Sequence, residues 1–209
     1  SPLPDRLHGE HGCVTTWCYT GPMADAEDVF EPVRAVGTPA LDLVEPVPYP
    51  ALQSMFDEMY YPPGLQWYWK GDFVRELPDE AVRVHLEHGL ELPTPLSTMH
   101  LYPIDGAVHR VDAEETAWSY RDATWSMVIA GVASDPADAG AITDWARDYW
   151  EALRPYSADG SYVNFMMDEG RDRIRATYRD NYERLRAVKA DYDPDNLFHV
   201  NQNVEPAGD

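Results

Sequence analysis

Apolar and polar residues alternate in six short segments of the chain, several of them rich in β-branched and aromatic residues. A period of two is typical of strands that bury one face. The predicted strands span residues 12–19, 66–70, 96–103, 107–111, 124–132 and 162–166. Within the last of these, Tyr162 and Asn164 would lie on one face of the strand and Phe165 on the other.

Six other segments carry apolar residues at spacings of three and four, which predicts amphipathic helices. They span residues 24–36, 49–60, 78–89, 112–120, 136–153 and 170–190. The last helix would bury a stripe made of Ile174, Tyr178, Tyr182, Leu185 and Val188. It should end before Asp193-Pro194, because a residue that precedes proline disfavours helical backbone. Leu197 and Phe198 would then anchor the chain again.

The two kinds of element do not alternate strictly, and no glycine-rich loop follows a predicted strand, so a doubly wound parallel sheet is not expected. We expect an α+β fold, with one mostly antiparallel sheet and helices packed on one face. The chain has 209 residues, of which 44% are hydrophobic. It is therefore long enough to bury a large core.

The charge of the chain restricts its partners. The formal net charge is -21, and Lys70 and Lys189 are the only lysines. Such a surface repels phosphate backbones, so we expect no nucleic-acid partner. No stretch reaches the roughly 18 apolar residues of a membrane span, and the start resembles no signal peptide. We therefore expect no membrane partner and a cytoplasmic location. Two explanations of the acidic excess stay open: a salt-rich cytoplasm, or a G+C-rich genome that favours arginine codons.

Two cysteines, Cys13 and Cys18, lie five residues apart. On a strand this odd spacing points them to opposite faces, where they could not easily form a disulfide. We expect buried thiols. No cysteine and histidine spacing indicates a zinc site, so no metal is expected.

The last predicted helix leads into the segment YDPDNLFHVNQNVEP, which spans residues 192–206. A fraying tail would be rich in glycine, serine and charge, whereas this segment contains a turn, an apolar pair and three consecutive side-chain amides, Asn201, Gln202 and Asn203. Amides donate and accept hydrogen bonds together, so these three could cap loose backbone or bind a polar ligand.

This C-terminal order of features resembles the berberine bridge enzyme-like flavoprotein oxidases of the vanillyl-alcohol oxidase superfamily. Further segments resemble the bacterial branch of that family in the same order along the chain, and the resemblance covers nearly all of it. They are PYPALQ at 48–53, YWK at 68–70, IDGA at 104–107, TAWSYR at 116–121 and YVNF at 162–165.

The resemblance implies an FAD-dependent oxidoreductase that transfers a hydride from an alcohol, sugar or aromatic small molecule to flavin N5, with oxygen as the usual acceptor. Residues 1–160 would form the substrate-binding α+β domain, and residues 161–209 would complete it and contact flavin. The FAD-binding domain would lie outside this chain, as a further domain or a separate subunit, and this chain alone would be inactive. A homo-oligomer is also an option.

The resemblance also assigns candidate roles to residues. Many relatives have tyrosine, a base in sugar oxidases of the group, where this chain has Phe165, so the base must come from elsewhere. The catalytic candidates are Tyr162, Tyr102 and His100, and the substrate-binding candidates are Tyr68, Thr98 and Phe165. The candidates for binding the flavin are Asn164, Asn201, Gln202 and Asn203.

Structural explanations compete with several of these roles. His100 could be a half-buried imidazole bonded to backbone, while Tyr102 and Tyr68 could be plain core residues. We expect the carboxylates to form solvated surface, and Asp168-Glu169 to complement the dipole of the following helix.

Two other functions stay open. One is a non-catalytic partner subunit or small-molecule binding domain that retains the fold, as Phe165 would allow. The other is a protein interaction module that uses an exposed sheet face.

Overall fold

A computed structural model describes residues 4–57 and 63–208 of the chain. The chain divides into two compact units, which we call unit 1 (Ser1–Pro63) and unit 2 (Gly64–Asp209), and each is described by itself. No helix among the described residues is long and apolar enough to cross a lipid bilayer.

Unit 1 contains short helices joined by long irregular segments. Its described elements include η1 (Asp5–Leu7), η2 (Met23–Asp25), α1 (Ala26–Arg34) and α2 (Tyr49–Gln53). The predicted helix 24–36 is thus confirmed in α1. The predicted helix 49–60 is confirmed in α2 as far as Gln53; residues 54–56 form a turn, and residues 58–60 of the prediction fall outside the described residues. Phe30 in α1 is the one buried residue among the described residues of this unit, so unit 1 has almost no core of its own.

The predicted strand 12–19 is wrong for the described part of unit 1, where these residues form no strand or helix. The prediction of buried thiols is also wrong, since Cys13 and Cys18 are both free and exposed. A period of two indicates strand tendency, but a strand needs a neighbour to bond with.

Unit 2 is built on a three-stranded antiparallel sheet, which confirms the α+β prediction. Its strands are β1 (Gln66–Val74), β2 (Thr98–Pro103) and β3 (Trp125–Ala133), in the order β1-β3-β2. All three fall on predicted strands. In the register, Val128 at the centre of β3 lies opposite both Gly71 and His100.

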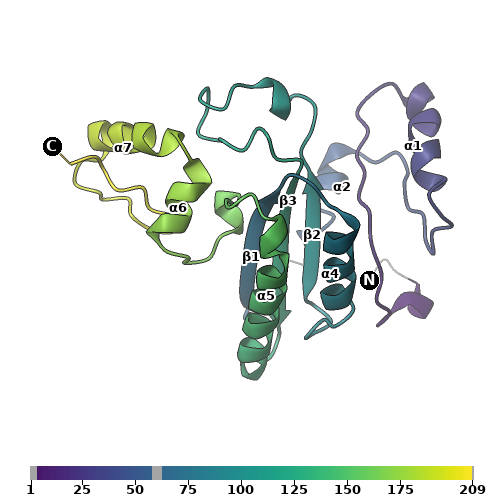
Figure 1. Cartoon of the computed structure of the whole chain (residues 1–209). Helices are drawn as coiled ribbons and strands as arrows, with labels where there is room; N and C mark the ends of the chain where they lie inside the picture. The colour runs from purple at the N-terminus through teal and green to yellow at the C-terminus, as the bar shows by residue number, and fades with distance from the viewer. Residues whose placement is uncertain (1–3, 58–62, 209) are drawn as a thin grey trace. The chain divides into compact units, whose positions relative to one another are not determined.

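Two helices, α4 (Asp79–Gly89) and α5 (Ala139–Leu153), cover one face of this sheet, which we call the helix-covered face (Figure 1). The core beneath them is apolar and includes Val74, Met127, Ile129, Ala146, Tyr149 and Leu153. Gly131 lets α5 approach β3, since a Cβ there would lie 2.6 Å from the Ile142 carbonyl oxygen. Both helices had been predicted, because their apolar residues recur at helical spacing.

The long connection between β2 and β3 differs from its prediction. Residues 107–111 form no strand but a short helix, η3 (Val108–Arg110), and residues 112–120 form turns rather than a helix. The segment is ordered by packing instead, because Tyr120 and Ala123 are buried beside Phe73 and Ile104. Tertiary contacts thus override the local pattern.

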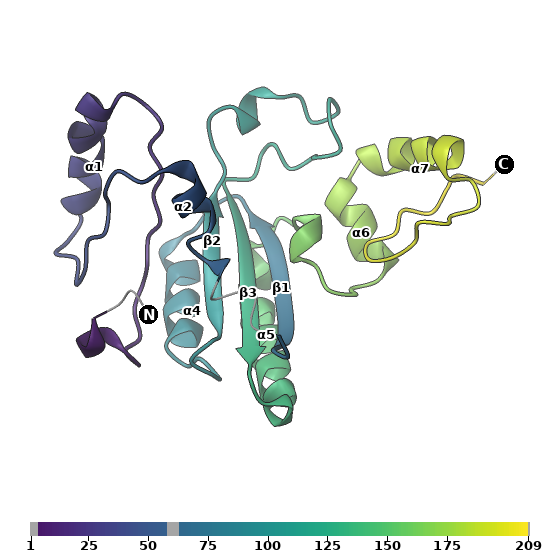
Figure 2. The ribbon, with the colours of Figure 1, turned by 180° about the vertical axis from the view of Figure 1, so that it is seen from behind.

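The predicted helix 170–190 is two helices, α6 (Arg171–Tyr178) and α7 (Asn181–Tyr192) (Figure 2). The break falls at Arg179, whose φ of 46° is incompatible with a continuing right-handed helix. The Asn181 side chain donates to the carbonyls of Ala113 and Thr116 at 2.7 and 2.9 Å, which fixes the start of α7.

The apolar anchor predicted at Leu197 and Phe198 is wrong, since these side chains are 71% and 77% exposed. Polar contacts hold the turn instead. The Asp193 carboxylate accepts hydrogen bonds from the backbone N–H groups of both residues, at 2.7 and 3.0 Å, and it pairs with Lys189. The Lys189 hydrogen bond lowers the pKa of Asp193, so the carboxylate that holds this turn is ionised.

Candidate functional site

The second face of the sheet carries most of the predicted site residues. Seen from behind, the strands lie in front of α5 (Figure 2). We call this side the Tyr102 face, because the alternation along β2 places Thr98, His100 and Tyr102 there together, as predicted. By the strand register, Trp69 and Gly71 of β1 share this face.

His100 and Tyr102 form a hydrogen-bonded pair, with 2.8 Å between the imidazole Nδ1 and the phenol oxygen. Burial lowers the pKa of His100, so the ring is neutral near pH 7 and Nδ1 can accept the phenol proton. Tyr102 is 42% exposed. A half-exposed phenol next to a neutral imidazole is a combination that can accept a proton from a bound molecule and pass it on.

The segment YVNF forms the short helix η6 (Val163–Phe165) instead of the predicted strand. Its first turn closes with a hydrogen bond from the Phe165 N–H to the Tyr162 carbonyl, at 2.7 Å. The prediction that Tyr162 and Asn164 share one face of a strand is therefore wrong, because no strand forms here. Their side chains still meet, because the Asn164 amide donates to the Tyr162 hydroxyl at 2.6 Å.

Aromatic contacts join η6 to the Tyr102 face. The ring of Phe165 lies 5.4 Å from that of Tyr102 and 5.1 Å from that of Tyr162, measured between centroids. This close approach depends on Gly71, since a Cβ there would lie 2.5 Å from the Ser161 hydroxyl and 2.7 Å from the Phe165 Cβ. Five predicted site residues thus form one contact chain: His100, Tyr102, Phe165, Tyr162 and Asn164.

Tyr68 does not join this group. It lies on the helix-covered face of β1, packed against the core, and its hydroxyl accepts a hydrogen bond from Arg147 Nε at 2.9 Å. Because successive residues of a strand point to opposite faces, Tyr68 and Tyr102 cannot line the same cavity.

The three consecutive amides have three different surroundings. Gln202 donates from Nε2 to the carbonyls of Met166 and Met167, at 2.9 and 3.0 Å, so it fastens the tail to the residues that follow η6. Asn203 has a buried Oδ1 that accepts no hydrogen bond from the described residues. Asn201 is exposed and has a φ of 64°.

A buried charge network on the helix-covered face was not predicted. Asp72 is 1% exposed and lies 3.4 Å from Arg173, while Glu169 pairs with Lys70 at 2.9 Å and with Arg173 at 3.6 Å. Burial raises the pKa of Asp72, against the opposing effect of Arg173. Glu169 is therefore a buried ion-pair partner, which corrects its interpretation as dipole complementation. Two charged residues in strand β1, at the same alternation as core residues, were the signal that sequence analysis missed.

Two further polar atoms of the Tyr102 face were also missed. Trp69 Nε1 and Ser126 Oγ are buried and have no hydrogen-bond partner among the described residues. Buried polar groups usually have a partner, so this face contains hydrogen-bonding capacity that the described chain does not use.

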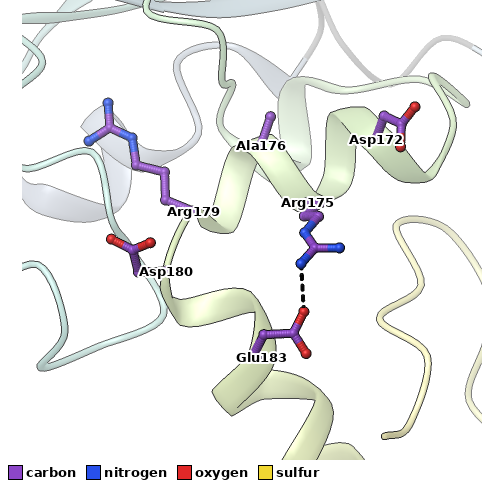
Figure 3. A pocket seen from close by; sticks show the side chains of 6 residues that line it. All are labelled: Asp172, Arg175, Ala176, Arg179, Asp180 and Glu183. Carbon is purple, nitrogen blue, oxygen red and sulfur yellow. Dashed lines mark hydrogen bonds and ion pairs between the residues drawn. The ribbon is translucent and has the colours of Figure 1, made fainter. Parts of the chain in front are cut away.

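A hollow of about 480 Å³ lies elsewhere, between α6 and α7 (Figure 3). Its lining consists of Asp172, Arg175, Ala176, Arg179, Asp180 and Glu183. Arg175 donates to Glu183 at 2.9 Å, and Arg179 donates to Asp122 at 2.7 Å. None of the predicted site residues lines this hollow, and both of its arginines are already paired, so we assign no ligand to it.

A search of residues 4–57 and 63–208 finds no group of three histidine, cysteine, aspartate or glutamate side chains that could hold a metal ion.

Comparisons with known proteins agree on one family. Residues 161–205 match the family model described as berberine and berberine like. An FAD-linked oxidoreductase from Dictyostelium discoideum is 26% identical over 197 residues, which cover 93% of this chain and 43% of that protein. The uncharacterised FAD-linked oxidoreductase YgaK from Bacillus subtilis is 26% identical over 90% of this chain and 42% of its own length.

The fold also has a close counterpart. The structure of berberine bridge enzyme from Eschscholzia californica matches 68% of this chain and 33% of its own, with a TM-score of 0.62 and 21% identity. The chain thus spans less than half the length of these relatives. In sequence and in fold the chain is similar to the berberine bridge enzyme-like FAD-linked oxidoreductases.

Proposed function

We propose that this chain is the substrate-binding part of an FAD-dependent oxidoreductase that oxidises an alcohol, a sugar or an aromatic small molecule by hydride transfer to flavin N5, with oxygen as acceptor. One observation carries the proposal: the family-matched segment begins with η6, and its Tyr162 and Phe165 join Tyr102 and His100 on the Tyr102 face. In domain terms, residues 1–160 would bind substrate and residues 161–209 would complete that domain.

The residues of the tail fit a flavin. The buried Oδ1 of Asn203 has no partner among the described residues, and it is an acceptor for a ring N–H of the kind that a flavin presents. Asn164 and Asn201 would add further amide contacts, whereas Gln202 would act through its hold on the backbone after η6. Most of the FAD would be bound by polypeptide outside this chain.

FAD, when bound, would supply the hydride acceptor, and the residues of this chain would orient the substrate and remove its proton. Tyr102 is the candidate base, and His100 would take up the phenol proton through their 2.8 Å hydrogen bond. Tyr162 is the second candidate, because its hydroxyl lies at the same aromatic cluster. Thr98 and Phe165 would contact the substrate.

The test is to produce this chain together with the polypeptide encoded upstream of it and to purify the product. We expect visible flavin absorbance that stays with the protein, and oxygen consumption with at least one member of a panel of alcohols, sugars and phenols. The 209-residue chain by itself should be colourless and inactive. A longer protein that is folded but colourless after incubation with FAD would contradict the proposal.

A second candidate function is small-molecule binding without catalysis. It is supported by Phe165, which lies beside Tyr102 but has no group that can accept a proton. A domain that kept the fold but not the chemistry would bind a small molecule without turnover. A flavin-loaded protein that binds members of the panel, but reduces its flavin with none of them, would favour this alternative.

A further inference from the structure

The loop that follows β2 holds a side-chain carboxyl and a backbone nitrogen in position to react with each other. Asp105 and Gly106 lie just beyond the end of this strand. The Gly106 N–H donates to Oδ1 of the Asp105 side chain at 2.6 Å. The carboxyl carbon is one bond away from that oxygen, so the Gly106 nitrogen lies beside it. Close approach of two reacting atoms is the arrangement that favours bond formation.

Unit 2 leaves this dipeptide free to rotate. The Asp105 side chain is 92% exposed, and a Cβ added to Gly106 would meet no atom within 4 Å. Gly106 has a φ of 64°, which glycine adopts without strain. Among the described residues of unit 2, no backbone-to-backbone hydrogen bond involves either residue. The rotations that would close a ring between side chain and backbone are therefore unrestrained.

His109 places a proton carrier beside the same carboxyl. Its Nε2–H donates to the Ala123 carbonyl at 2.9 Å, so in the neutral ring Nδ1 has the lone pair. Nδ1 lies 3.8 Å from Asp105 Oδ1, a separation that one bridging water can span. The imidazole can thus take a proton from the Gly106 amide and return it to the leaving oxygen.

We propose that Asp105-Gly106 is a site of spontaneous isoaspartate formation in the folded protein, assisted by His109. With the carboxyl in its acid form, the Gly106 nitrogen bonds to the carboxyl carbon and the C–OH bond breaks. The hydroxyl leaves as water with the amide proton. A second water then opens the cyclic imide at the former backbone carbonyl, so that the main chain runs through the side chain of residue 105.

The product would change the backbone next to the candidate site. Isoaspartate adds one carbon to the main chain directly after Ile104, which is buried and whose N–H donates to the Thr124 carbonyl at 2.7 Å. Tyr102 lies three residues before Asp105. The reaction consumes no oxidant, reductant or cofactor, so the inference does not rest on the proposed function.

The chain contains one other Asp-Gly dipeptide, Asp159-Gly160, and there the fold opposes the reaction. The Asp159 N–H donates to the Ser157 hydroxyl at 2.9 Å, and the Asp159 carbonyl accepts from Arg173 at 2.8 Å. Gly160 is buried, and its carbonyl accepts from the Phe73 N–H at 2.7 Å. Ring closure at this position would break these contacts, so the same dipeptide should react more slowly.

The test is to age the folded longer protein, which includes the polypeptide encoded upstream, in mildly acidic buffer below its unfolding temperature. Peptide mapping with electron-based fragmentation separates aspartate, isoaspartate and the imide, which is lighter by one water, at each position. We expect residue 105 to convert at least about tenfold faster than residue 159. In urea, where both dipeptides lose their contacts, the two rates should agree within about threefold.

Two matched pairs of variants control the experiment. Asp105→Glu lengthens the side chain and should remove most of the isoaspartate that a protein isoaspartyl methyltransferase detects, whereas Asp159→Glu should leave that amount nearly unchanged. His109→Gln keeps a donor for the Ala123 carbonyl but cannot carry a proton, and it should slow conversion at residue 105 by about tenfold or more. His199→Gln, in the tail, should not.

Equal rates at residues 105 and 159 in the folded protein would overturn the proposal, as would an aged protein with neither imide nor isoaspartate at residue 105. An unchanged rate in His109→Gln would overturn the role of His109. The comparison of the two dipeptides uses the unchanged protein, so it does not depend on the folding of a variant. It also does not depend on flavin absorbance, so failure of the proposed function and failure of this inference are separate results.

Discussion

The two faces of the sheet in unit 2 differ in how their polar groups are used. On the helix-covered face, Lys70 and Asp72 point toward α5 and are locked in ion pairs with Glu169 and Arg173. On the Tyr102 face, Tyr102 remains 42% exposed, and the buried Trp69 Nε1 has no partner among the described residues.

This difference separates stability from function. Charges buried in pairs hold elements together, and removing one partner leaves the other buried and uncompensated. Hydroxyl, imidazole and indole groups with remaining capacity can bind a ligand without breaking the fold. We therefore expect substitutions on the helix-covered face to change the free energy of unfolding, and substitutions on the Tyr102 face to change activity.

The largest effect is expected for Tyr102→Phe. If Tyr102 removes the substrate proton, the flavin-loaded longer protein should lose about 10²- to 10⁴-fold in the rate of flavin reduction, the usual contribution of a general base. Stopped-flow absorbance of the flavin measures this rate. Tyr68→Phe is the matched control, because it removes a phenol from the opposite face of the sheet, and its rate should stay within about threefold of the unchanged protein. Equal rates for the two variants would contradict the assignment.

Arg173→Met comes next and tests the helix-covered face. It leaves Asp72 buried without its charge partner, which should reduce the free energy of unfolding by about 3–5 kcal/mol. Urea denaturation followed by tryptophan fluorescence gives this value. Arg175→Met is the control, since the pair of Arg175 with Glu183 is largely exposed and should contribute less than about 1 kcal/mol. Similar losses in both variants would show that the network adds no special stability.

Gly71→Ala should change both stability and activity. The added Cβ would lie 2.5 Å from the Ser161 hydroxyl and 2.8 Å from the Phe165 carbonyl oxygen, so η6 must move away from the sheet. We expect a loss of about 1–3 kcal/mol in unfolding free energy, together with slower flavin reduction because Phe165 and Tyr162 shift. Gly140→Ala has open space around its Cβ and should leave both measurements nearly unchanged. An unaffected Gly71→Ala protein would mean that η6 is not held against the sheet.

The smallest effect concerns pH and His85, a buried residue of α4 whose Nδ1 lies 2.8 Å from the Tyr149 hydroxyl of α5. Burial, with a smaller contribution from His88, lowers the pKa of His85 to about 4, whereas an unfolded histidine titrates near its ordinary 6.5. The unfolded chain therefore binds the proton first as the pH falls. The contribution of the neutral, buried His85 to the free energy of unfolding is complete above pH 6.5. It is lost as the pH falls from 6.5 through 4.

His85→Gln should flatten the unfolding free energy between these pH values, and His199→Gln, in the exposed tail, should not. Denaturation curves at pH 7, 6, 5 and about 4 give the slope of unfolding free energy against pH. This slope, and not the absolute stability, is compared between each variant and the unchanged protein. Asp122 should cause a separate loss of stability at lower pH. Burial acts to raise the pKa of Asp122, but hydrogen bonds from Arg179 and Arg75 lower it to about 2. The unfolding free energy should therefore fall further as the pH drops below 3.8, the ordinary pKa of the carboxyl. An unchanged slope in His85→Gln would contradict the role of His85.

The predictions that held were those that depend on neighbours along the chain. The strands around Trp69, His100 and Val128 and the helices α4 and α5 follow from periodicity. The similarity to the berberine bridge enzyme-like proteins follows from ordered motifs such as those ending in Asn203. The alternation along β2 also placed Thr98, His100 and Tyr102 together. The break at Arg179, the short helix η6 and the buried role of Glu169 could not be predicted, because each depends on residues distant in the sequence.

The sequence by itself thus determined the α+β class, the resemblance to the family and the β2 residues of the candidate site, since these depend on local periodicity and on motif order. Only the tertiary structure decided that Tyr68 faces away from Tyr102, that Gln202 fastens the backbone after η6 and that Asp72 is buried with Arg173. The physical reason is that side-chain partners are chosen by packing in three dimensions. A pattern along the chain shows which face a residue prefers, but not which atoms will meet it there.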